Sequence, residues 1–535
     1  MVRRIFFLGS AGALVVTLGA AWFWPAALWG FAALGPLIAV GIWDLTQRSH
    51  SLRRNYPIIG HGRYLFEALR PEIQQYFVES NLDGVPFSRQ IRSVIYQRAK
   101  SDLATIPFGT QQRVYETGYE WCAHTMTPAP HLSEPPRVLI GEHTCRKPYS
   151  CSVFNISAMS YGALSHTAIE ALNKGAQLGG FAHNTGEGGV SEYHRKNGGD
   201  LIWQIGTGYF GCRTADGGFD EIKFAQVAND DQIKMVEVKI SQGAKPSHGG
   251  ILPGVKVSEE IARIRGVEVG KDVISPPTHK TFDTPIGLLQ FLARLREASG
   301  GKPVGFKICI GRPEEFMAIA KAMIETGLHP DFITVDGAEG GTGAAPLEFT
   351  NSVGMPLREG LLFVHNVLVG CGLRSRIKII AAGKIATAFQ MYRAMALGAD
   401  ICNSARGMMF AIGCIQSLRC NKNDCPVGVA TQDRALASAL DVSSKAVRVF
   451  RYHQETIKAF MELLSATGKS SPSEITASDI FRRVSASSIK RFDEIYEFIA
   501  PQSLLSGSAP KALQNCWDCA DPGSFGPKNQ TLLSA

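Results

Sequence analysis

Between residues 150 and 435, short runs rich in β-branched and aromatic residues alternate with segments of helical spacing. The candidate strands are residues 152–156, 181–184, 202–205, 235–240, 273–275, 304–308, 332–335, 377–381 and 401–403. Helical patterns fall between most of them, such as residues 285–298, 313–326 and 387–397. This alternation predicts parallel β/α units, and their number favours an α/β fold of the (β/α)8 TIM barrel type over an open sheet. No G-x-G-x-x-G motif opens a helix after an early strand, which argues against a Rossmann fold.

Motifs rich in glycine and polar residues follow several of these strands. They are residues 157–165, 184–189, 239–246, 336–343, 381–384 and 403–407. In (β/α)8 barrels the reacting groups lie where the strands end. Glycine lets a backbone approach a ligand closely, so this placement predicts an enzyme whose loops hold a cofactor at one end of the barrel.

Three cysteines, Cys414, Cys420 and Cys425, form a C-x5-C-x4-C-P run. Thiolates gathered in one loop, with a proline after the last, suit iron–sulfur ligation. Three thiolates indicate a cluster that lacks one iron corner, a three-iron centre, or a site with one ligand other than cysteine. Structural zinc is less favoured, because it takes four ligands and no histidine lies in the run. The alternative is three buried cysteines without a function.

Residues 413–432, with the cysteine run and the sequence Cys-Pro-Val-Gly-Val-Ala-Thr-Gln, resemble the cluster loop of the glutamate synthase FMN-binding domain. The six glycine and polar motifs resemble segments of the same domain in the same order, so the resemblance covers about residues 150–435. It implies FMN as a cofactor and a 3Fe-4S cluster held by Cys414, Cys420 and Cys425.

An FMN of this kind needs backbone N–H groups for its phosphate, which glycine loops late in a barrel provide. The residues expected at the phosphate are Gly341, Thr342, Gly383, Lys384, Ser404, Ala405 and Arg406. Those expected along the flavin ring are Ser157, Ala158, Met159 and Ser160. Lys307 is expected to stabilise the negative charge of the reduced flavin. The alternative for Lys307 is a buried lysine held in a salt bridge.

The resemblance also implies an acidic substrate. Lys239, Lys245 and Arg265 lie on or after the fourth strand and match positions that bind 2-oxoglutarate in the family, and arginine binds a carboxylate through two parallel hydrogen bonds. The implied reaction is reduction of 2-iminoglutarate, formed from 2-oxoglutarate and ammonia, to L-glutamate. Glu187 would handle protons or orient the imine, and Gln204 would contact flavin or substrate. Solvated surface residues are the alternative for each.

The chain departs from the family at Ile251, which replaces a glutamine that contacts 2-oxoglutarate. A flavin oxidoreductase acting on another 2-oxo or amino acid is therefore a second hypothesis. A third is a non-catalytic electron-transfer subunit docked at the membrane. The electron donor is left open between a ferredoxin-like protein, a partner subunit and the quinone pool. Cys516 and Cys519 form a C-x-x-C pair that is either redox active or incidental.

Residues 5–24 and 26–43 are two uncharged apolar runs, each long enough to cross a bilayer as a helix. Arginines precede the first run and follow the second, which predicts a transmembrane helical hairpin with both ends in the cytoplasm. We therefore expect a protein of the cell inner membrane whose catalytic part is cytoplasmic. A secretory signal peptide is the alternative.

Charge and cysteine content narrow the function further. A net charge of +8, with no basic run interleaved with aromatics, disfavours a nucleic-acid partner. Twelve scattered cysteines suggest a reducing compartment. The expected division is a hairpin over residues 1–48, a lead-in region over 49–150 that packs on the barrel, the barrel over 151–435, and a small helical C-terminal extension over 436–535. Within that extension, residues 446–464 and 489–498 are expected to be helical.

Overall fold

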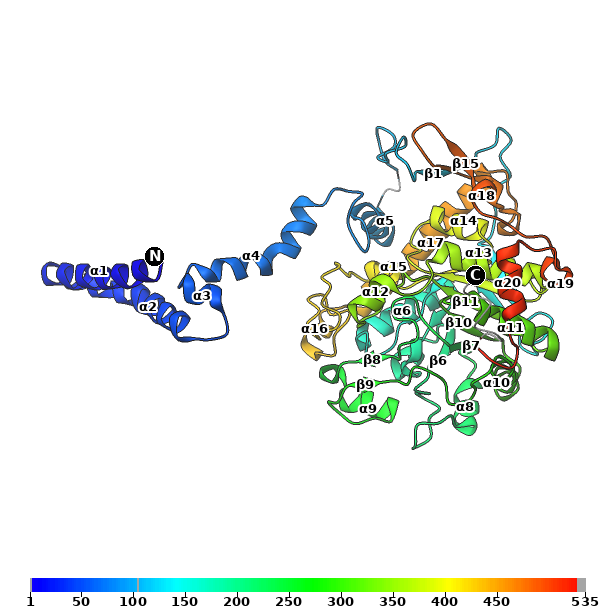
Figure 1. Ribbon diagram of the computed structural model, residues 1–535, viewed down its shortest axis with the longest axis horizontal. Coiled ribbons are helices and arrows are strands. Elements are labelled where there is room, and N and C mark those ends of the chain that lie inside the picture. The colour runs from blue at the N-terminus through cyan, green and yellow to red at the C-terminus, as the bar shows by residue number, and fades with distance from the viewer. Residues whose placement is uncertain (1, 103–104, 527–535) are drawn as a thin grey trace. The chain divides into compact units, whose positions relative to one another are not determined.

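The computed structural model describes residues 2–102 and 105–526. They form two compact units, and the boundary along the chain lies between Arg89 and Gln90. In the first unit, α1 (Val2–Phe23) and α2 (Phe31–Thr46) lie side by side and are joined by the 3-10 helix η1 (Pro25–Gly30) (Figure 1). The unit continues through α3 (Ser51–Asn55), α4 (Gly60–Ile73) and the π-helix η2 (Gln74–Val78).

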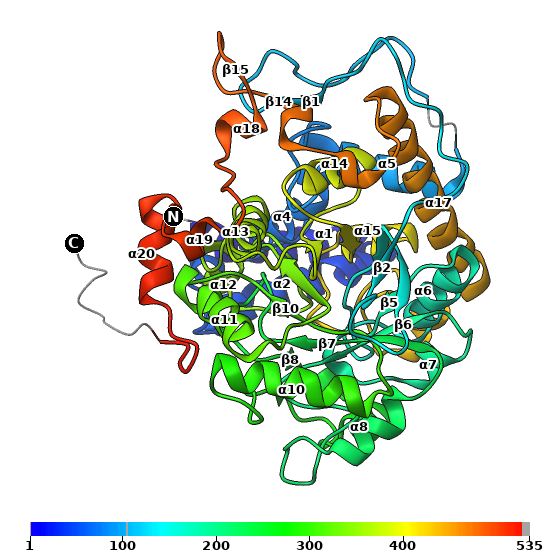
Figure 2. The ribbon, with the colours of Figure 1, turned by 90° about the vertical axis from the view of Figure 1, so that its right-hand side faces the viewer.

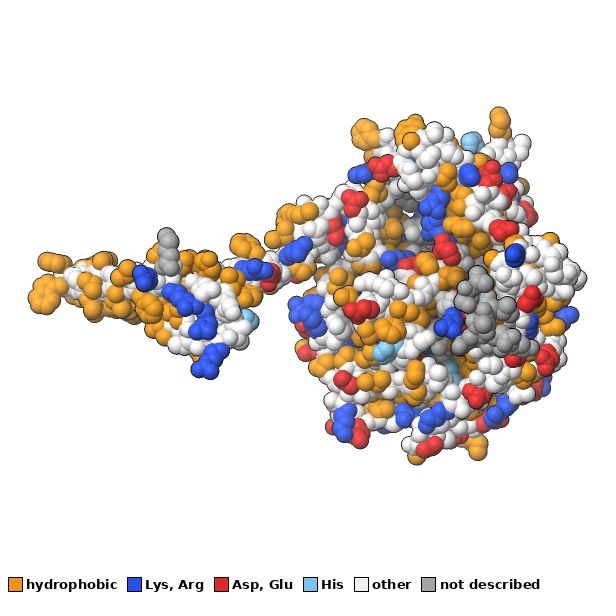
Figure 3. Space-filling model, viewed as in Figure 1, with side chains coloured by type: hydrophobic (Ala, Val, Ile, Leu, Met, Phe, Trp, Pro, Cys, Tyr) orange, Lys and Arg blue, Asp and Glu red, His pale blue; other side chains and the backbone are white. Residues whose placement is uncertain are grey.

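The two first helices of this unit expose apolar side chains along their length. The segments Val2–Phe23 and Pro25–Thr46 are long and apolar enough to cross a membrane, although a signal sequence would pass the same test. Figure 3 shows hydrophobic side chains along the pair, with basic side chains, all of them arginines in this part of the sequence, gathered at one end. There Arg3 Nε donates to the carbonyl of Arg54 over 2.7 Å, so both ends of the hairpin meet on one side.

The core of the second unit is a closed barrel of eight parallel strands, in the spatial order β10-β11-β12-β13-β4-β5-β6-β7. The strands are β4 (Phe154–Ile156), β5 (His183–Asn184), β6 (Leu201–Ile205), β7 (Ile233–Lys239), β10 (Val304–Ile308), β11 (Phe332–Asp336), β12 (Lys378–Ala382) and β13 (Ile401–Ser404). Nearly every strand residue is buried, as expected of parallel strands covered on both faces. The predicted barrel is confirmed.

Helices surround the barrel, and Figure 2 shows the strands enclosed by them. They include α6 (His166–Gly179), α8 (Glu221–Ala228), α10 (Pro285–Ala298), α11 (Pro313–Thr326), α13 (Leu357–Gly370), α14 (Ala388–Ala396) and α15 (Arg406–Ala411). Capping residues determine where several of these helices begin. The hydroxyls of the N-cap residues Ser165, Thr284 and Thr387 accept hydrogen bonds from backbone N–H groups in the first turns of α6, α10 and α14. The long α17 (Val442–Ala466) packs on α6 and α14 and completes the layer.

Shorter helices occupy the loops and the two ends of this unit. They are α5 (Arg89–Lys100), α7 (Glu192–Arg195), α9 (Glu259–Arg265), α12 (Leu347–Ser352), α16 (Arg434–Ser438), α18 (Phe492–Ile495), α19 (Ser503–Ser506) and α20 (Lys511–Cys519), together with the 3-10 turns η3 (Gly186–Gly188), η4 (Gly254–Lys256), η5 (Pro472–Glu474) and η6 (Ala477–Asp479).

Two predicted elements differ from the structure. The strand expected at residues 273–275 forms outside the barrel, where β9 (Val273–Ile274) pairs antiparallel with β8 (Ile251–Leu252). The helix expected over 489–498 is wrong in its first part, because β15 (Ile489–Arg491) pairs with β14 (Ile480–Arg483), which in turn pairs with β1 (Glu120–Cys122). In both places strand pairing outweighs local propensity, which a short run cannot specify alone.

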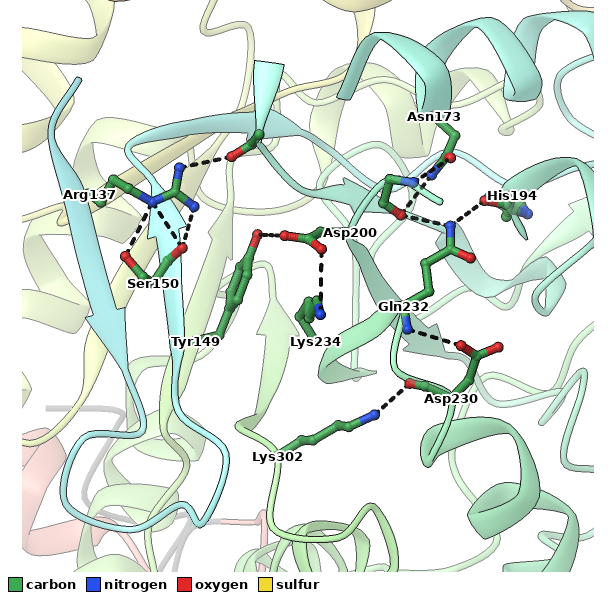
Figure 4. Close-up of polar contacts among 12 residues, drawn as sticks. Arg137, Tyr149, Ser150, Asn173, His194, Asp200, Asp230, Gln232, Lys234 and Lys302 are labelled. Carbon is green, nitrogen blue, oxygen red and sulfur yellow. Dashed lines mark hydrogen bonds and ion pairs between the residues drawn. The ribbon is translucent and has the colours of Figure 1, made fainter. Parts of the chain in front are cut away.

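The amino-terminal end of the barrel is closed by a hairpin of β2 (Arg137–Ile140) and β3 (Tyr149–Ser152). Its apolar side chains join the first residues of the barrel strands in one buried cluster, made of Ile140, Tyr149, Cys151, Ala182, Ile202, Met235, Phe332, Ile380 and Ile401. Polar contacts surround it (Figure 4): Tyr149 Oη donates to Asp200 Oδ2 over 2.8 Å, and Lys302 Nζ donates to the carbonyl of Asp230 over 2.6 Å. The hairpin and these contacts stabilise the fold.

Candidate functional site

The opposite, carboxyl-terminal end of the strands contains a cavity with an empty volume of about 840 Å³, its open mouth included. Eight of the residues expected at a flavin line it: Ala158, Met159, Ser160, Lys307, Gly341, Thr342, Ala405 and Arg406. Gln204 and Glu187, which were expected at the substrate, line it as well. The glycine and polar motifs therefore converge on one site. We call this space the ring cavity.

Four other residues expected at the flavin support this cavity from behind or from its edge and do not line it. Ser157 donates its backbone N–H to the carbonyl of Ser404 over 3.1 Å, and the Ser404 hydroxyl donates to the carbonyl of Ile385 over 2.6 Å. The turn of Gly383 and Lys384 has positive φ at both residues, 151° and 51°. Burial lowers the pKa of the Lys384 ammonium, and the nearby charge of Arg406 lowers it further.

Lys307 is the penultimate residue of β10 and forms an ion pair with a carboxylate. Its Nζ lies 3.0 Å from Asp336 Oδ2, at the end of the neighbouring strand β11, and the same oxygen accepts the N–H of Gly243 over 3.1 Å. Burial lowers the pKa of Lys307, but the charges of Asp336 and Glu237 raise it more, so its net pKa is raised. Lys307 is therefore a protonated group on the wall of the ring cavity, and the salt bridge weighed in the sequence analysis is also present.

Glu237 is a residue that the sequence analysis missed. It lies within β7, is 1% exposed, and accepts hydrogen bonds from Asn184, Gln204 and Thr334 over 2.8, 2.7 and 2.5 Å. It thereby links four strands across the barrel interior and orients the Gln204 amide. Its only signal in the sequence is a carboxylate between two valines of a buried strand, which is unusual because charged side chains are rarely buried unless paired.

A second cavity of about 500 Å³ adjoins the first and shares Ser160, Ala163, Glu187, Thr342, Gly343 and Cys420 with it. Lys245, Lys256 and Arg265 line it. The Lys245 ammonium donates to the carbonyl of Ala344 over 2.9 Å, and Arg265 Nη2 donates to the carbonyl of Tyr161 over 2.9 Å. We call this space the cation pocket.

Glu187 is the carboxylate between these cations. Its Oε1 lies 2.9 Å from Lys239 Nζ. Burial raises the pKa of Glu187, but Lys239, Lys245 and Arg265 lower it more, so the group is held ionised. Burial lowers the pKa of Lys245 to about 8 and that of Arg265 to about 10. The predicted cations do meet, although Arg265 comes from the end of α9, which follows the β8 strand, and the site has more positive than negative charge.

Glycines make this close approach possible. A Cβ on Gly206 would lie 2.7 Å from Glu187 Oε2, and one on Gly250 would lie 2.6 Å from Glu187 Oε1. Real side chains do not come that close, so both positions need glycine for the carboxylate to sit where it does. Ile251 follows Gly250 and lines the cation pocket from β8.

The cysteine loop borders both cavities through Cys420. Tyr96 Oη on α5 donates to the carbonyl of Cys414 over 2.5 Å, and Lys256 Nζ donates to the carbonyl of Cys420 over 3.0 Å. Burial raises the pKa of the Cys414 thiol to about 12, and the charges of Cys420 and Cys425 raise it as well. Within residues 2–102 and 105–526, however, no three His, Cys, Asp or Glu side chains converge closely enough to hold a metal ion.

The C-x-x-C pair lies elsewhere. Cys516 and Cys519 are on α20, where the Trp517 ring contacts the ammonium of Lys321, and neither cysteine lines either cavity. Both are free thiols.

Residues 120–470 match the family model described as the conserved region in glutamate synthase. The chain is 40% identical over 503 residues to the glutamate synthase large subunit-like protein YerD of Bacillus subtilis, covering 86% of this chain and 95% of that protein. It is 35% identical over 314 residues to the archaeal glutamate synthase [NADPH] of Archaeoglobus fulgidus, covering 58% of each.

The chain thus spans little more than half the length of that archaeal relative and of others like it. A mutant flavocytochrome b2 with pyruvate bound superposes with a TM-score of 0.41 at 12% identity, covering 82% of this chain and 92% of that one. The match to the family model and the YerD identity are decisive: the chain belongs to the glutamate synthase family and is a glutamate synthase-like oxidoreductase.

Proposed function

We propose that this chain binds FMN and reduces 2-iminoglutarate, formed from 2-oxoglutarate and ammonia, to L-glutamate. The observation that carries the proposal is the pair of joined cavities at the mouth of the barrel, one lined by glycine and polar motifs with Lys307 and Arg406, the other by Lys245, Lys256 and Arg265. When bound, the flavin would supply a hydride to the carbon of the C=N bond. The side chains of the protein would bind and orient the substrate and neutralise the charge of its carboxylates.

The ring cavity fits a flavin chemically. Residues 158–160 offer a narrow wall of small or unbranched side chains against a flat ring, and Lys307 offers a positive charge. Gln242 Nε2 is buried at this wall without a hydrogen-bond partner in the described part of the chain, and a flavin oxygen or nitrogen would satisfy it. Arg406 with Gly341 and Thr342 would hold the phosphate, and a Cβ on Gly341 would lie 2.7 Å from the Arg406 guanidinium.

The cation pocket would hold the substrate carboxylates. Lys245 and Arg265 would bind them, because charge-assisted hydrogen bonds to a carboxylate are about twice as strong as neutral ones. Glu187, kept ionised by Lys239, would accept a hydrogen bond from the substrate nitrogen and orient it. Gln204, fixed by Glu237, would mark the boundary between ring and substrate.

We infer that Cys414, Cys420 and Cys425 hold a 3Fe-4S cluster fed by a ferredoxin-like protein or another electron-donor subunit. Three free thiols in one loop support this, as does the position of Cys420 on both cavities. Iron and sulfide analysis with EPR of anaerobically reconstituted protein tests it. A Cys420→Ser variant is expected to lose the cluster signal and keep its flavin, and a wild-type protein that takes up no iron would contradict the inference.

We further propose that residues 1–48 anchor the protein in the cell inner membrane, residues 49–150 lead to the barrel of 151–435, and residues 436–535 form an extension on it, all but the anchor being cytoplasmic. Exposed apolar side chains on α1 and α2 and the arginines at one end of the pair support the anchor. The protein should stay with membranes in high salt and leave them in detergent. A mature amino terminus after the first helix would instead indicate a cleaved signal.

The deciding experiment is an anaerobic assay of the purified protein with 2-oxoglutarate, ammonia and a chemical reductant, beside extraction of the flavin and its identification by mass. Glutamate formation is expected. A protein without flavin absorbance overturns the proposal.

Ile251 in the cation pocket favours the alternative, an oxidoreductase for a different 2-oxo or amino acid. It predicts turnover of a shorter or apolar 2-oxo acid instead, and gain of 2-oxoglutarate activity in Ile251→Gln. A reducible flavin without turnover of any acid would indicate an electron-transfer subunit.

A further inference from the structure

A separate cavity opens at the amino-terminal end of the barrel, the end away from the ring cavity. Its empty volume is about 1000 Å³, open mouth included. It is formed by the turn between β2 and β3 and by the loops that precede β11 and β12. Its lining residues are Leu139, Gly141, Glu142, His143, Thr144, His329, Ser375, Arg376 and Lys378.

Two cations in this cavity differ from their neighbours. Neither the Arg376 guanidinium nor the Lys378 ammonium makes a hydrogen bond or an ion pair with any residue that the structure describes. Other cations at this end are engaged: Arg296 Nη2 lies 3.0 Å from Asp331, and Arg374 Nη2 lies 2.9 Å from Asp400. The two unengaged cations thus face the same open space.

The acidic groups nearby do not neutralise them. Asp331 is 2% exposed, and its carboxylate is taken by Arg296, by the Thr144 hydroxyl and by the N–H of Val304. Glu142 is largely exposed, and its Oε2 lies 3.9 Å from His143 Nε2. The space between Arg376 and Lys378 therefore keeps an excess of positive charge.

A neutral imidazole and a hydroxyl complete the lining. Burial lowers the pKa of His329, so its imidazole is neutral at pH 7. Its Nδ1 donates to the carbonyl of Pro330 over 3.3 Å, which leaves Nε2 as an acceptor. Ser375 precedes Arg376 in the chain and lines the cavity with it. Gly141, at φ +80°, shapes the opposite wall, where a Cβ would lie 2.5 Å from the Cys145 sulfur.

We propose that this cavity is a binding site for a compact polyanion, such as a diphosphate group or a tricarboxylate, held by Arg376 and Lys378 with a hydrogen bond from the Ser375 hydroxyl. Arginine binds either kind of anion through two parallel hydrogen bonds, and lysine adds a point charge. The site is independent of the flavin, because it lies at the other end of the strands and shares no lining residue with the ring cavity or the cation pocket.

The test is calorimetric titration of the full-length, flavin-loaded protein in detergent, once with pyrophosphate and once with citrate. One binding site per chain is expected for at least one of them, with weaker binding as salt rises. The tighter of the two identifies the source of the anion. Flavin absorbance is monitored throughout, so that loss of cofactor, which would concern the proposed function, is separated from failure to bind the anion.

A double variant and a matched control decide the location. Arg376→Gln with Lys378→Gln is expected to weaken binding tenfold or more. Lys458→Gln with Lys490→Gln removes the same charge from exposed positions outside the cavity and is expected to leave affinity unchanged. Absence of binding by the wild-type protein, or equal affinity in the cavity variant, overturns the proposal.

Discussion

The two ends of the barrel differ in how their polar groups are matched. At the base, the hairpin of β2 and β3 seals an apolar cluster, and Tyr149, Asp200 and Lys302 each have partners. At the mouth, Glu187 is shared among Lys239, Lys245 and Arg265, and Gln242 has an amide without a partner in the described residues. The side chains around the hairpin therefore serve stability, whereas those at the mouth leave polar groups for a ligand to satisfy.

That contrast has an energetic reason. Burying a charge costs free energy unless a partner compensates it, so a protein gains nothing in stability from three clustered cations. The lowered pKa of Lys245 reports this cost. The buried cations at the mouth thus cost stability and favour binding. Substitutions in the hairpin region should therefore lower the free energy of unfolding and leave KM unchanged, whereas substitutions at the mouth should raise KM and leave the free energy of unfolding unchanged.

The largest effect is expected at the base. Phe332 is fully buried in the apolar cluster, and Phe332→Ala should lower the free energy of unfolding by about 3–5 kcal/mol, because it leaves a cavity. Urea unfolding measures this. Turnover per bound flavin should stay at the wild-type value, and Phe332→Leu should cost much less. If folded Phe332→Ala lost turnover, the hairpin region would contribute to activity as well as to stability, which contradicts the comparison.

At the mouth the expected pattern is reversed. Lys245→Gln should raise KM for the 2-oxo acid about 10- to 100-fold, since a charge-assisted hydrogen bond contributes roughly 1.5–3 kcal/mol. Its free energy of unfolding should not fall, because a buried charge is removed. Steady-state kinetics and urea unfolding test both statements, with exposed Lys458→Gln as the control. A destabilised variant with unchanged KM would assign Lys245 to the fold.

The pH dependence of KM sharpens the same point. Burial lowers the pKa of Lys245 to about 8, so the positive charge proposed to bind the substrate is lost above that pH and not above the ordinary pKa of a lysine. KM should be flat below about pH 8 and rise about tenfold per unit above it. Because the unfolded chain keeps this proton to higher pH, stability should rise with pH in the same window. Lys245→Arg should abolish the rise in KM, and a profile unchanged in this variant would exclude Lys245 as its source.

The smallest expected effect is again at the base. Asp200→Asn weakens the acceptor of the Tyr149 hydroxyl and removes the charge facing Lys234. It should lower the free energy of unfolding by about 1 kcal/mol, the usual contribution of one hydrogen bond. Urea unfolding of the variant and of the wild-type protein measures this difference in free energy, and KM is determined in parallel. A change in KM larger than twofold would mean that the base is coupled to the mouth.

The barrel was predictable because its strands are apolar runs that alternate with helices, and all eight appear within a residue or two of their expected places. β9 could not be assigned to its hairpin, because a pair of β-branched residues does not reveal which strand it meets. The pairing of β14 with β1 joins residues more than 350 positions apart, and no local pattern specifies it.

The site was predictable where glycine motifs marked the ends of strands, which brought Lys239, Lys245 and Glu187 to notice together. Glu237 was missed because its importance comes from three partners on other strands. Ser157 and Ser404 do not line the ring cavity, and the Ser404 hydroxyl donates to the carbonyl of Ile385 instead, a contact that no local pattern reveals.

The closure of the barrel also bears on how this protein associates in solution. A barrel without a free edge gives a neighbouring copy no strand to extend, so the barrel itself is protected from edge-to-edge aggregation. Precipitation during purification should then originate in the bare apolar surface of α1 and α2. A detergent that covers this apolar surface should therefore prevent precipitation better than a change in surface charge.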